Sequence, residues 1–149
     1  MTADYSLLLP QADEVTRGYW DAARRHELAA QRCNRCGAWM HPPKVPLQYG
    51  HFTDGPCLEC GSEEWEWAPV SGRGTLHSYV IVSQPVLPQW REIAPYNVAI
   101  VALEEDERVQ MVTNVVEIED DALRVGMPLE VVFDDVTEEV TLPRWRPRR

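Results

Sequence analysis

The sequence has few positive charges and no long hydrophobic run. Its 149 residues contain 14 lysines and arginines against 24 aspartates and glutamates, which gives a net charge of −10. Such a charge repels the phosphates of nucleic acids and the anionic surfaces of membranes. No apolar stretch approaches the roughly 18 residues that a membrane span needs. The composition therefore disfavours nucleic-acid binding and predicts a protein without a membrane anchor.

The sequence also predicts no secretory leader. The short apolar run near the N-terminus has no basic residue before it, and Pro10, Asp13 and Glu14 interrupt it. We therefore expect a cytoplasmic protein. Thiols stay reduced in that compartment, so the four cysteines indicate metal or redox chemistry before structural disulfides.

The common catalytic motifs are missing as well. The chain has no GxSxG nucleophile elbow and no P-loop. Its histidines are scattered along the sequence, at His26, His41, His51 and His77. Residues 71–74 (SGRG) offer backbone amides that suit a phosphate, but this pattern is more typical of a turn. We therefore predict no catalysis by this chain alone.

The four cysteines form two pairs with the same local pattern. Two residues separate Cys33 from Cys36 and Cys57 from Cys60, and a glycine follows each pair. This spacing lets one tight turn aim both sulfurs at one ion, and the glycine supplies the positive φ that the turn needs. The 20 residues between the pairs lie at the long edge of zinc spacings. The pattern predicts a closed, structural zinc site with four thiolate ligands.

Two other uses of these cysteines compete with zinc. A redox dithiol would need one CxxC beside a βαβ pattern, which the sequence does not show. The same thiolates suit a single iron ion, as in rubredoxin, and iron would make the protein an electron carrier. The colour of the purified protein separates the two metals, because ferric thiolate is red and zinc is spectroscopically silent.

Three segments succeed one another along the chain, whose 44% hydrophobic residues can bury one core. Residues 13–28 place apolar side chains at helical spacing, with Asp13 as the cap, and predict an amphipathic helix weakened by Gly18. Residues 28–67 hold the cysteine pairs between short strands. In this second segment Trp65 and Trp67 share one strand face, and we expect them to pack between it and the third segment.

From residue 70 onward, β-branched runs alternate with proline, glycine or acidic turns. They predict five strands. These are residues 74–84, 96–103, 108–117, 129–133 and 136–142. Five closely spaced strands without crossover helices suggest a small barrel, of which the OB-fold is the commonest example. Residues 119–123 are expected to form a single helical turn.

These motifs resemble a known family. The ordered segments CNRCG, GPCLECGS, SGRGTLHSYVIV, APYNVAIVALE, TNVV, LRVGMPLEVVF and LPRWRP are similar to those of the DUF35 family, from about residue 17 to 147. The resemblance implies a mainly β fold with an N-terminal helix, a rubredoxin-like zinc ribbon and then a five-stranded OB-fold barrel. Its parts would be residues 1–28 for the N-terminal segment and helix, 29–68 for the ribbon and 69–149 for the OB-fold with a basic tail.

The resemblance also bears on the metal site. The family's ligand positions match Cys33, Cys36, Cys57 and Cys60, which implies structural zinc. One departure is residues 47–55, which look like an insertion between the two cysteine pairs. The departure affects the geometry of that loop and not the metal.

Finally, the resemblance implies a function. DUF35 proteins are accessory subunits or fused domains of thiolase-superfamily enzymes. The chain is thus expected to be a non-catalytic subunit that stabilises such an enzyme and helps it to bind acyl-CoA. The expected partner is a lipid-transfer-protein-like thiolase or aldolase, in a heterotetramer. One lysine against 13 arginines is typical of a GC-rich genome and favours a steroid side-chain retro-aldolase. The alternatives are a single-stranded nucleic-acid binder and an iron electron carrier.

Two parts of the chain are predicted to contact the partner. Tyr19 and Trp20 lie on or beside the apolar stripe of the predicted helix. Four arginines gather in the last six residues, where Arg144, Trp145 and Arg146 suit an anionic ligand such as coenzyme A or an acidic groove of the partner. The alternative for this tail is a solvated, frayed terminus.

Overall fold

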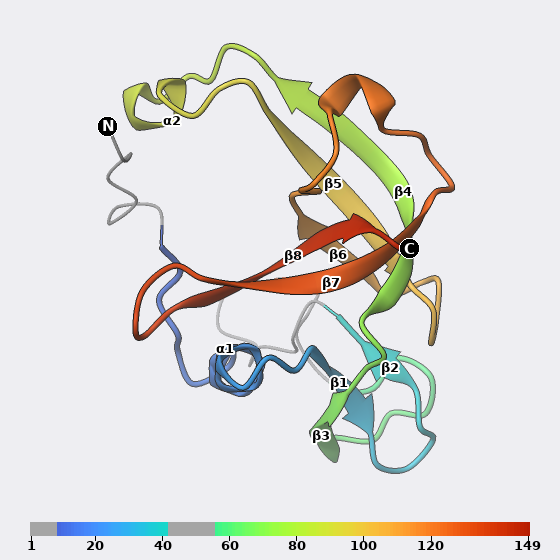
Figure 1. The fold of residues 1–149 in the computed structure, drawn as a ribbon. Coiled ribbons are helices and arrows are strands. Elements are labelled where there is room, and N and C mark those ends of the chain that lie inside the picture. Colours follow the sequence, from blue (N-terminus) through green and yellow to red (C-terminus); the bar gives the residue numbers. More distant parts are fainter. Residues whose placement is uncertain (1–8, 42–55) are drawn as a thin grey trace.

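The computed structural model describes residues 9–41 and 56–149, and its strands form two sheets (Figure 1). The smaller sheet has the order β2-β1-β3 and the larger one the order β6-β5-β4-β7-β8. No helix in these ranges is long and apolar enough to cross a bilayer. The elements in chain order are α1 (Arg17–Arg24), β1 (Ala29–Cys33), β2 (Trp39–Met40), β3 (Trp65–Pro69), β4 (Arg73–Val82), α2 (Pro88–Arg91), β5 (Tyr96–Leu103), β6 (Gln110–Thr113), the 3₁₀ turn η2 (Asp120–Ala122), β7 (Pro128–Asp135) and β8 (Thr141–Pro147).

The larger sheet curls into the half-barrel of an OB-fold. Its outermost strands, β6 and β8, approach each other where Val115 pairs in parallel with Trp145. The N–H of Trp145 donates to the carbonyl of Asn114 at 3.1 Å, and its carbonyl accepts from the N–H of Val116 at 2.7 Å. Closing a sheet in this way satisfies edge groups that would otherwise stay open. The predicted five-stranded OB-fold is confirmed.

One of the five predicted strands is wrong. The structure places a turn at residues 136–140, where the hydroxyl of Thr137 accepts the N–H groups of Glu139 and Val140 at 3.1 and 2.9 Å. The last strand, β8, instead covers Thr141–Pro147 and pairs with β7 along seven residues. Local composition suggested a frayed basic tail here, whereas pairing with β7 makes it part of the sheet. The predicted helical turn at residues 119–123 is confirmed as η2.

Ribbon and barrel share one hydrophobic core. The barrel contributes the fully buried Leu76, Leu123 and Trp145. Leu28 and Ala30, which lie just before and within β1, belong to the same buried cluster, and Tyr19 of α1 packs against it. Burial of this shared apolar surface is what holds the two parts together.

Helix α1 is shorter than predicted. Asp13 is not the helix cap that the sequence predicts: the helix begins at Arg17 with Thr16 as its N-cap. The Oδ1 of Asp13 instead accepts the N–H groups of Val15 and Thr16, at 3.0 and 2.8 Å, in the turn before the helix. Gly18 is required by packing: a Cβ at this position would lie 2.2 Å from the Trp67 ring. Glycine therefore lets the helix lie directly on β3.

The end of α1 is tied to the barrel. His26 has a φ of 57°, in the left-handed region, and its ring stacks on Phe133 of β7 with 5.2 Å between centroids. Its Nε2 lies 3.0 Å from both carboxylate oxygens of Asp135. The helix thus lies between the ribbon and the β7–β8 hairpin, below the barrel in Figure 1.

Candidate metal centre

The two cysteine pairs fold into matching turns. In the first, the N–H of Gly37 donates to the carbonyl of Cys33 at 2.9 Å, and in the second the N–H of Gly61 donates to the carbonyl of Cys57 at 2.8 Å. The two glycines have φ values of 76° and 72°, which only glycine adopts without strain. The glycine after each CxxC is therefore needed for the turn, as the sequence pattern predicts.

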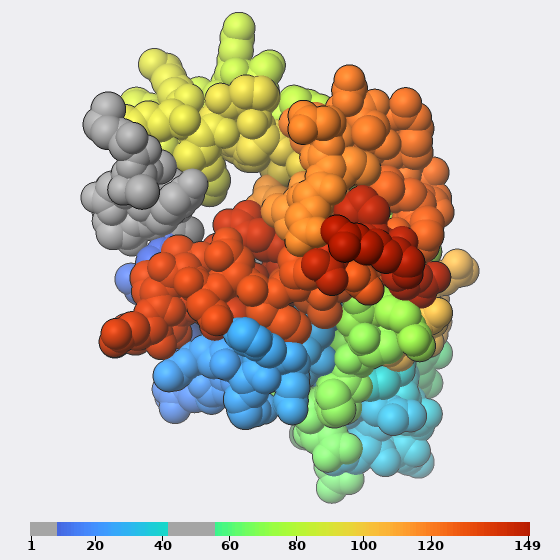
Figure 2. All heavy atoms as spheres, viewed as in Figure 1, coloured from blue at the N-terminus to red at the C-terminus, as the bar shows by residue number. Residues whose placement is uncertain are grey.

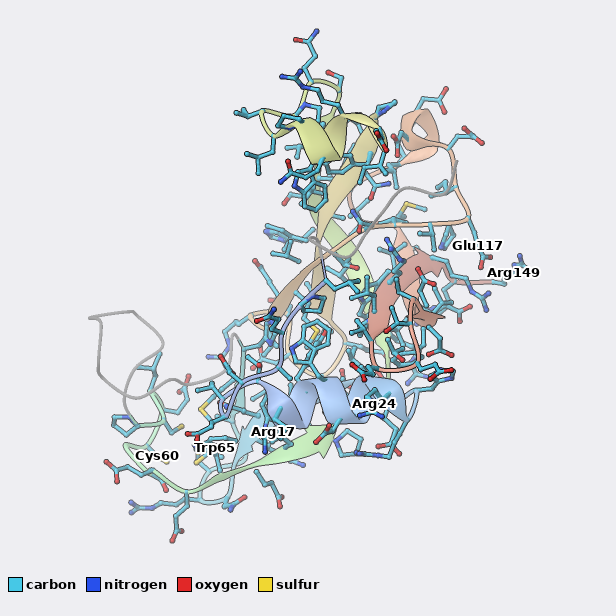
Figure 3. The ribbon with its side chains drawn as sticks, turned by 90° about the vertical axis from the view of Figure 1, so that its left-hand side faces the viewer. Arg17, Arg24, Cys60, Trp65, Glu117 and Arg149 are labelled. Carbon is cyan, nitrogen blue, oxygen red and sulfur yellow. The ribbon has the colours of Figure 1, made fainter. Side chains whose placement is uncertain are left out.

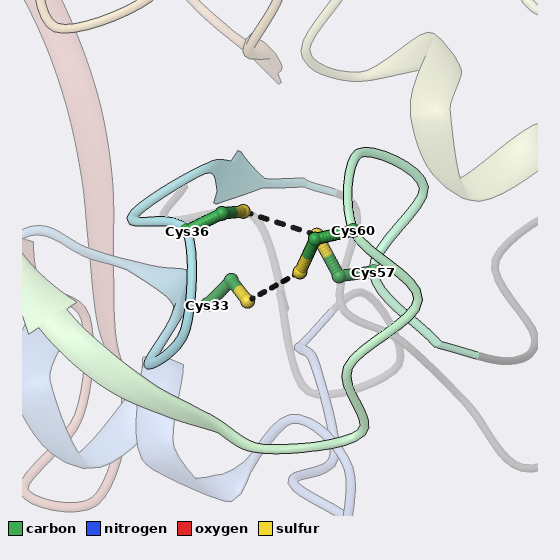
Figure 4. Close-up of side chains that lie close together, drawn as sticks. All are labelled: Cys33, Cys36, Cys57 and Cys60. Carbon is green, nitrogen blue, oxygen red and sulfur yellow. Dashed lines mark hydrogen bonds between the residues drawn. The ribbon is translucent and has the colours of Figure 1, made fainter.

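The turns bring all four sulfurs together (Figure 4). The Sγ atoms lie within 4.8 Å of one another, and the Cys33–Cys60 and Cys36–Cys57 pairs are each 3.6 Å apart. A tetrahedral zinc ion with bonds of about 2.3 Å would hold its sulfurs about 3.8 Å apart. The four side chains fit such an ion without rearrangement of the turns.

Backbone amides that point at the sulfurs favour the thiolate form, which binds a cation. The N–H groups of Cys36 and then of Arg35 donate to the Cys33 sulfur and lower its pKa to about 6. The N–H of Ala38 acts in the same direction on Cys36, but desolvation by the clustered sulfurs and hydrogen bonds with the neighbouring thiols raise the pKa of Cys36 to about 12. Sulfurs this close repel each other's charge, so all four ionise only with a cation among them.

Packing around the centre closes one side of it. Cys33 and Cys57 are buried with Met40, and Ala38 packs against them, while Cys36 faces solvent. Four thiolates complete a tetrahedron and leave no position for a substrate. The arrangement is that of a structural metal site. Residues 47–55, the expected insertion, and His51 lie outside the described residues.

Tyr19 and Trp20, the residues of α1 that are predicted to contact the partner, lie in different surroundings. Tyr19 packs toward the core beside Trp67, and burial raises the pKa of its hydroxyl to about 12. Trp20 is half-buried and meets the Tyr19 ring edge-on, with 4.9 Å between centroids. It lines a hollow of about 450 Å³ with Arg24 and Val140. Trp20, unlike Tyr19, thus lines a surface hollow.

The basic tail is built into the barrel. Trp145 is 1% exposed, so its predicted role at an interface is corrected: the indole fills the core. Arg144 is 2.8 Å from Asp134, and Arg146 is 2.8 Å from Glu130. The last residue, Arg149, lies beside Glu117 and far from the ribbon (Figure 3). These ion pairs leave less positive charge for an external anion than the sequence suggests.

A second hollow, of about 830 Å³, lies between the segment that contains α2 and the β7–β8 hairpin (Figure 2). Trp90 and Tyr96 line one side of it, and Leu142 and Arg144 the other. The guanidinium of Arg144 is held by Asp134 and, at 3.1 Å, by Asn114. Asp120, Asp134 and Asp135 also line the hollow, and their charge disfavours a phosphate there.

The structure also exposes apolar side chains on the barrel that the motif analysis did not single out. Val80 of β4 and Val112 of β6 are 59% and 72% exposed, and Val86 in the connection between β4 and β5 is 87% exposed. A signal for them exists in the sequence. A half-buried antiparallel strand alternates apolar and polar residues, whereas residues 79–82 (YVIV) do not alternate.

Comparison with known proteins identifies the family of the chain. The ChsH2 rubredoxin-like zinc ribbon domain matches residues 20–47, and the ChsH2 C-terminal OB-fold domain matches residues 67–134. A DUF35 domain-containing scaffold protein of Methanothermobacter thermautotrophicus is 32% identical over 85% of this chain and 86% of its own length. The chain belongs to the DUF35 family. The resemblance noted in the sequence is therefore confirmed.

Further relatives of this DUF35 protein are subunits of larger assemblies by name. A solved chain of the "Ltp2-ChsH2(DUF35) aldolase" superposes with a TM-score of 0.76 at 32% identity, covering 93% of this chain and 98% of that chain. The 3-oxo-4,17-pregnadiene-20-carboxyl-CoA hydratase alpha subunit of Mycobacterium tuberculosis is 28% identical over 95% of this chain. The chain spans 36% to 40% of the length of the hydratase alpha subunits that it matches.

Proposed function

We propose that this DUF35 protein is a non-catalytic accessory subunit that holds a thiolase-superfamily partner in its active form. The observation that carries the proposal is the match to the chain of the Ltp2-ChsH2(DUF35) aldolase, which extends over 98% of that chain at 32% identity. A match over the whole chain includes the helix and ribbon as well as the barrel, so it concerns the full architecture and not a common module alone.

The placement of reactive side chains supports a non-catalytic role. The cysteines point toward one another in the ribbon, and the three described histidines lie in different places. His26 stacks on Phe133, His41 lies 6.3 Å from the Tyr19 ring, and His77 is on the exposed side of β4. The acid and base of the reaction would then come from the partner.

Zinc held by Cys33, Cys36, Cys57 and Cys60 is proposed to be structural. When bound, the ion supplies the attraction that holds two turns together across the 20 residues between them. Iron remains the alternative, and a family model described as a zinc ribbon favours zinc. Metal analysis of the purified protein distinguishes zinc from iron. About one equivalent of zinc is expected. A red protein with one iron would support the electron carrier instead.

The substrate of the assembly is proposed to be a steroid acyl-CoA thioester. One relative is named for a pregnadiene-carboxyl-CoA and a solved relative for aldolase activity, which together favour retro-aldol cleavage of a β-hydroxyacyl-CoA side chain. Binding of acyl-CoA would be a property of the complex. A heterotetramer, with two copies of each subunit, is the proposed assembly.

Co-expression tests this function directly. The tagged chain is produced together with the untagged thiolase-superfamily protein encoded next to its gene, and both are captured on the tag. We expect equimolar recovery, and a partner that is active only in the complex. A ribbon variant, Cys57→Ser, should lose the metal, and its capture of the partner measures how far assembly depends on the ribbon. A partner that is fully active alone and is not captured would contradict the proposal.

A further inference from the structure

Strands β4 and β5 and the connection between them carry few charges. These elements span residues 73–103, whose charged residues are Arg73, Arg91 and Glu92. At the 26% charged content of the chain, 31 residues would carry about eight. Surfaces that face water are normally charged, and depletion of charge is typical of the centre of protein interfaces.

Strand register puts apolar residues on the outer face of this sheet. Val80 pairs with Val98, and Ile100 pairs with Val112 across the next pair of strands. Their neighbours on the opposite face, including Ala99, point into the core. The four residues Val80, Val98, Ile100 and Val112 therefore form an apolar stripe across β4, β5 and β6, which we call the outer stripe.

The connection between β4 and β5 extends the outer stripe. Val86 and Leu87 are 87% and 52% exposed, and no charged residue lies between them and the end of β4. This connection lies at the opposite end of the molecule from the zinc ribbon, as Figures 1 and 3 both show. The apolar surface is thus separate from the metal centre and from α1.

We propose that the outer stripe, together with Val86 and Leu87, is the docking surface for the partner subunit. The inference rests on the proposed function, because it identifies where that partner binds. Burial of exposed valine and leucine side chains against an apolar partner surface is the expected source of affinity. A second copy of this chain is disfavoured as the occupant, since two copies would each bring a net charge of −10 to the contact.

Three variants test the proposal. Each replaces one exposed valine by aspartate, and one of the three is a matched control outside the proposed surface. Val86→Asp changes the connection, Val112→Asp changes the outer stripe, and Val125→Asp changes a valine that is 66% exposed outside this surface. Each tagged chain is co-expressed with the untagged thiolase-superfamily protein encoded next to its gene. Zinc content and melting temperature of each variant alone report whether it folds. We expect at least a tenfold loss of captured partner for Val86→Asp and Val112→Asp, and less than a twofold change for Val125→Asp.

The outcomes separate the inference from the function on which it rests. If the wild-type chain captures the partner and folded Val86→Asp captures as much, the surface is wrong while the accessory role stands. If the wild-type chain captures nothing, the proposed function fails and this inference with it. If Val86→Asp instead converts a dimer of the isolated chain into a monomer and leaves capture unchanged, the occupant is a second copy and the proposal is overturned.

Discussion

Replacing Gly18 by alanine has two opposing effects on stability, each of known sign. Within a helix, alanine is more favourable than glycine by about 1 kcal/mol, so helix propensity alone predicts stabilisation. The structure predicts the reverse, because the added Cβ would lie 2.2 Å from Cδ1 and Nε1 of Trp67. Displacement of the ring would disturb its edge-on contact with Trp65, with 6.0 Å between centroids, and its contact with Tyr19.

The balance of the two effects gives the magnitude. Overpacking by a methyl group costs about 1 to 3 kcal/mol, and the clash here lies well inside the 3.5 to 4.0 Å of a normal carbon contact. After subtraction of the propensity gain of about 1 kcal/mol, we expect Gly18→Ala to lower the free energy of unfolding by up to about 2 kcal/mol. In a Trp67→Leu background, where the clash is relieved, the same change should stabilise by up to about 1 kcal/mol.

Urea denaturation followed by circular dichroism, at a fixed concentration of free zinc, measures both effects. Asp21→Ala is the matched control, because it raises propensity on the exposed side of the same helix and should be neutral or stabilising. A sign reversal between the two backgrounds would identify Trp67 as the cause. Stabilisation by Gly18→Ala in the wild-type chain would refute the reasoning.

The described contacts support three further predictions. Cys33→Ser should release the metal and unfold the ribbon, seen as loss of zinc and of β-sheet signal, and retention of a full equivalent of zinc would contradict the four-thiolate site. Trp145→Ala should cost about 3 to 5 kcal/mol because the indole is buried, whereas a small effect on urea denaturation would place the indole outside the core. Burial lowers the pKa of His41 to about 4 from 6.5, so the unfolded chain takes up the proton first. Stability should therefore fall as pH drops from 6.5 toward 4, by up to about 3 kcal/mol, and His41→Phe should flatten this dependence in denaturation curves at pH 7 and pH 5. An unchanged pH profile in that variant would show that another group is responsible.

The ribbon and most strands could be predicted from local patterns in the sequence. The CxxCG repeats predict two identical turns, because two residues between thiolates and a following glycine determine the turn geometry without help from distant residues. The strand at Tyr96–Leu103 agrees with prediction at both ends, since a β-branched run stands between a proline-containing turn and an acidic one. Four sulfurs that converge on one point were therefore predictable.

Other features could not be predicted from local patterns. The sequence predicts the last strand at residues 136–142, five residues too early, because neither the turn after β7 nor the pairing of Trp145 with the distant residues 114–116 shows in the local pattern. The same pairing turns Trp145 inward and sets Arg144 and Arg146 beside acidic residues, so a tail that looks like an anion site becomes a wall of the barrel.

The sequence by itself determined the metal ligands' spacing, the mainly β character and the order of helix, ribbon and barrel. Each depends on interactions within a few residues or on the chain's overall composition. Only the tertiary structure decided which face of each strand meets the core, why Gly18 must be glycine beside Trp67 and which valines stay open to solvent. Those outcomes depend on how closed sheets and packed helices fill space, which no local pattern encodes.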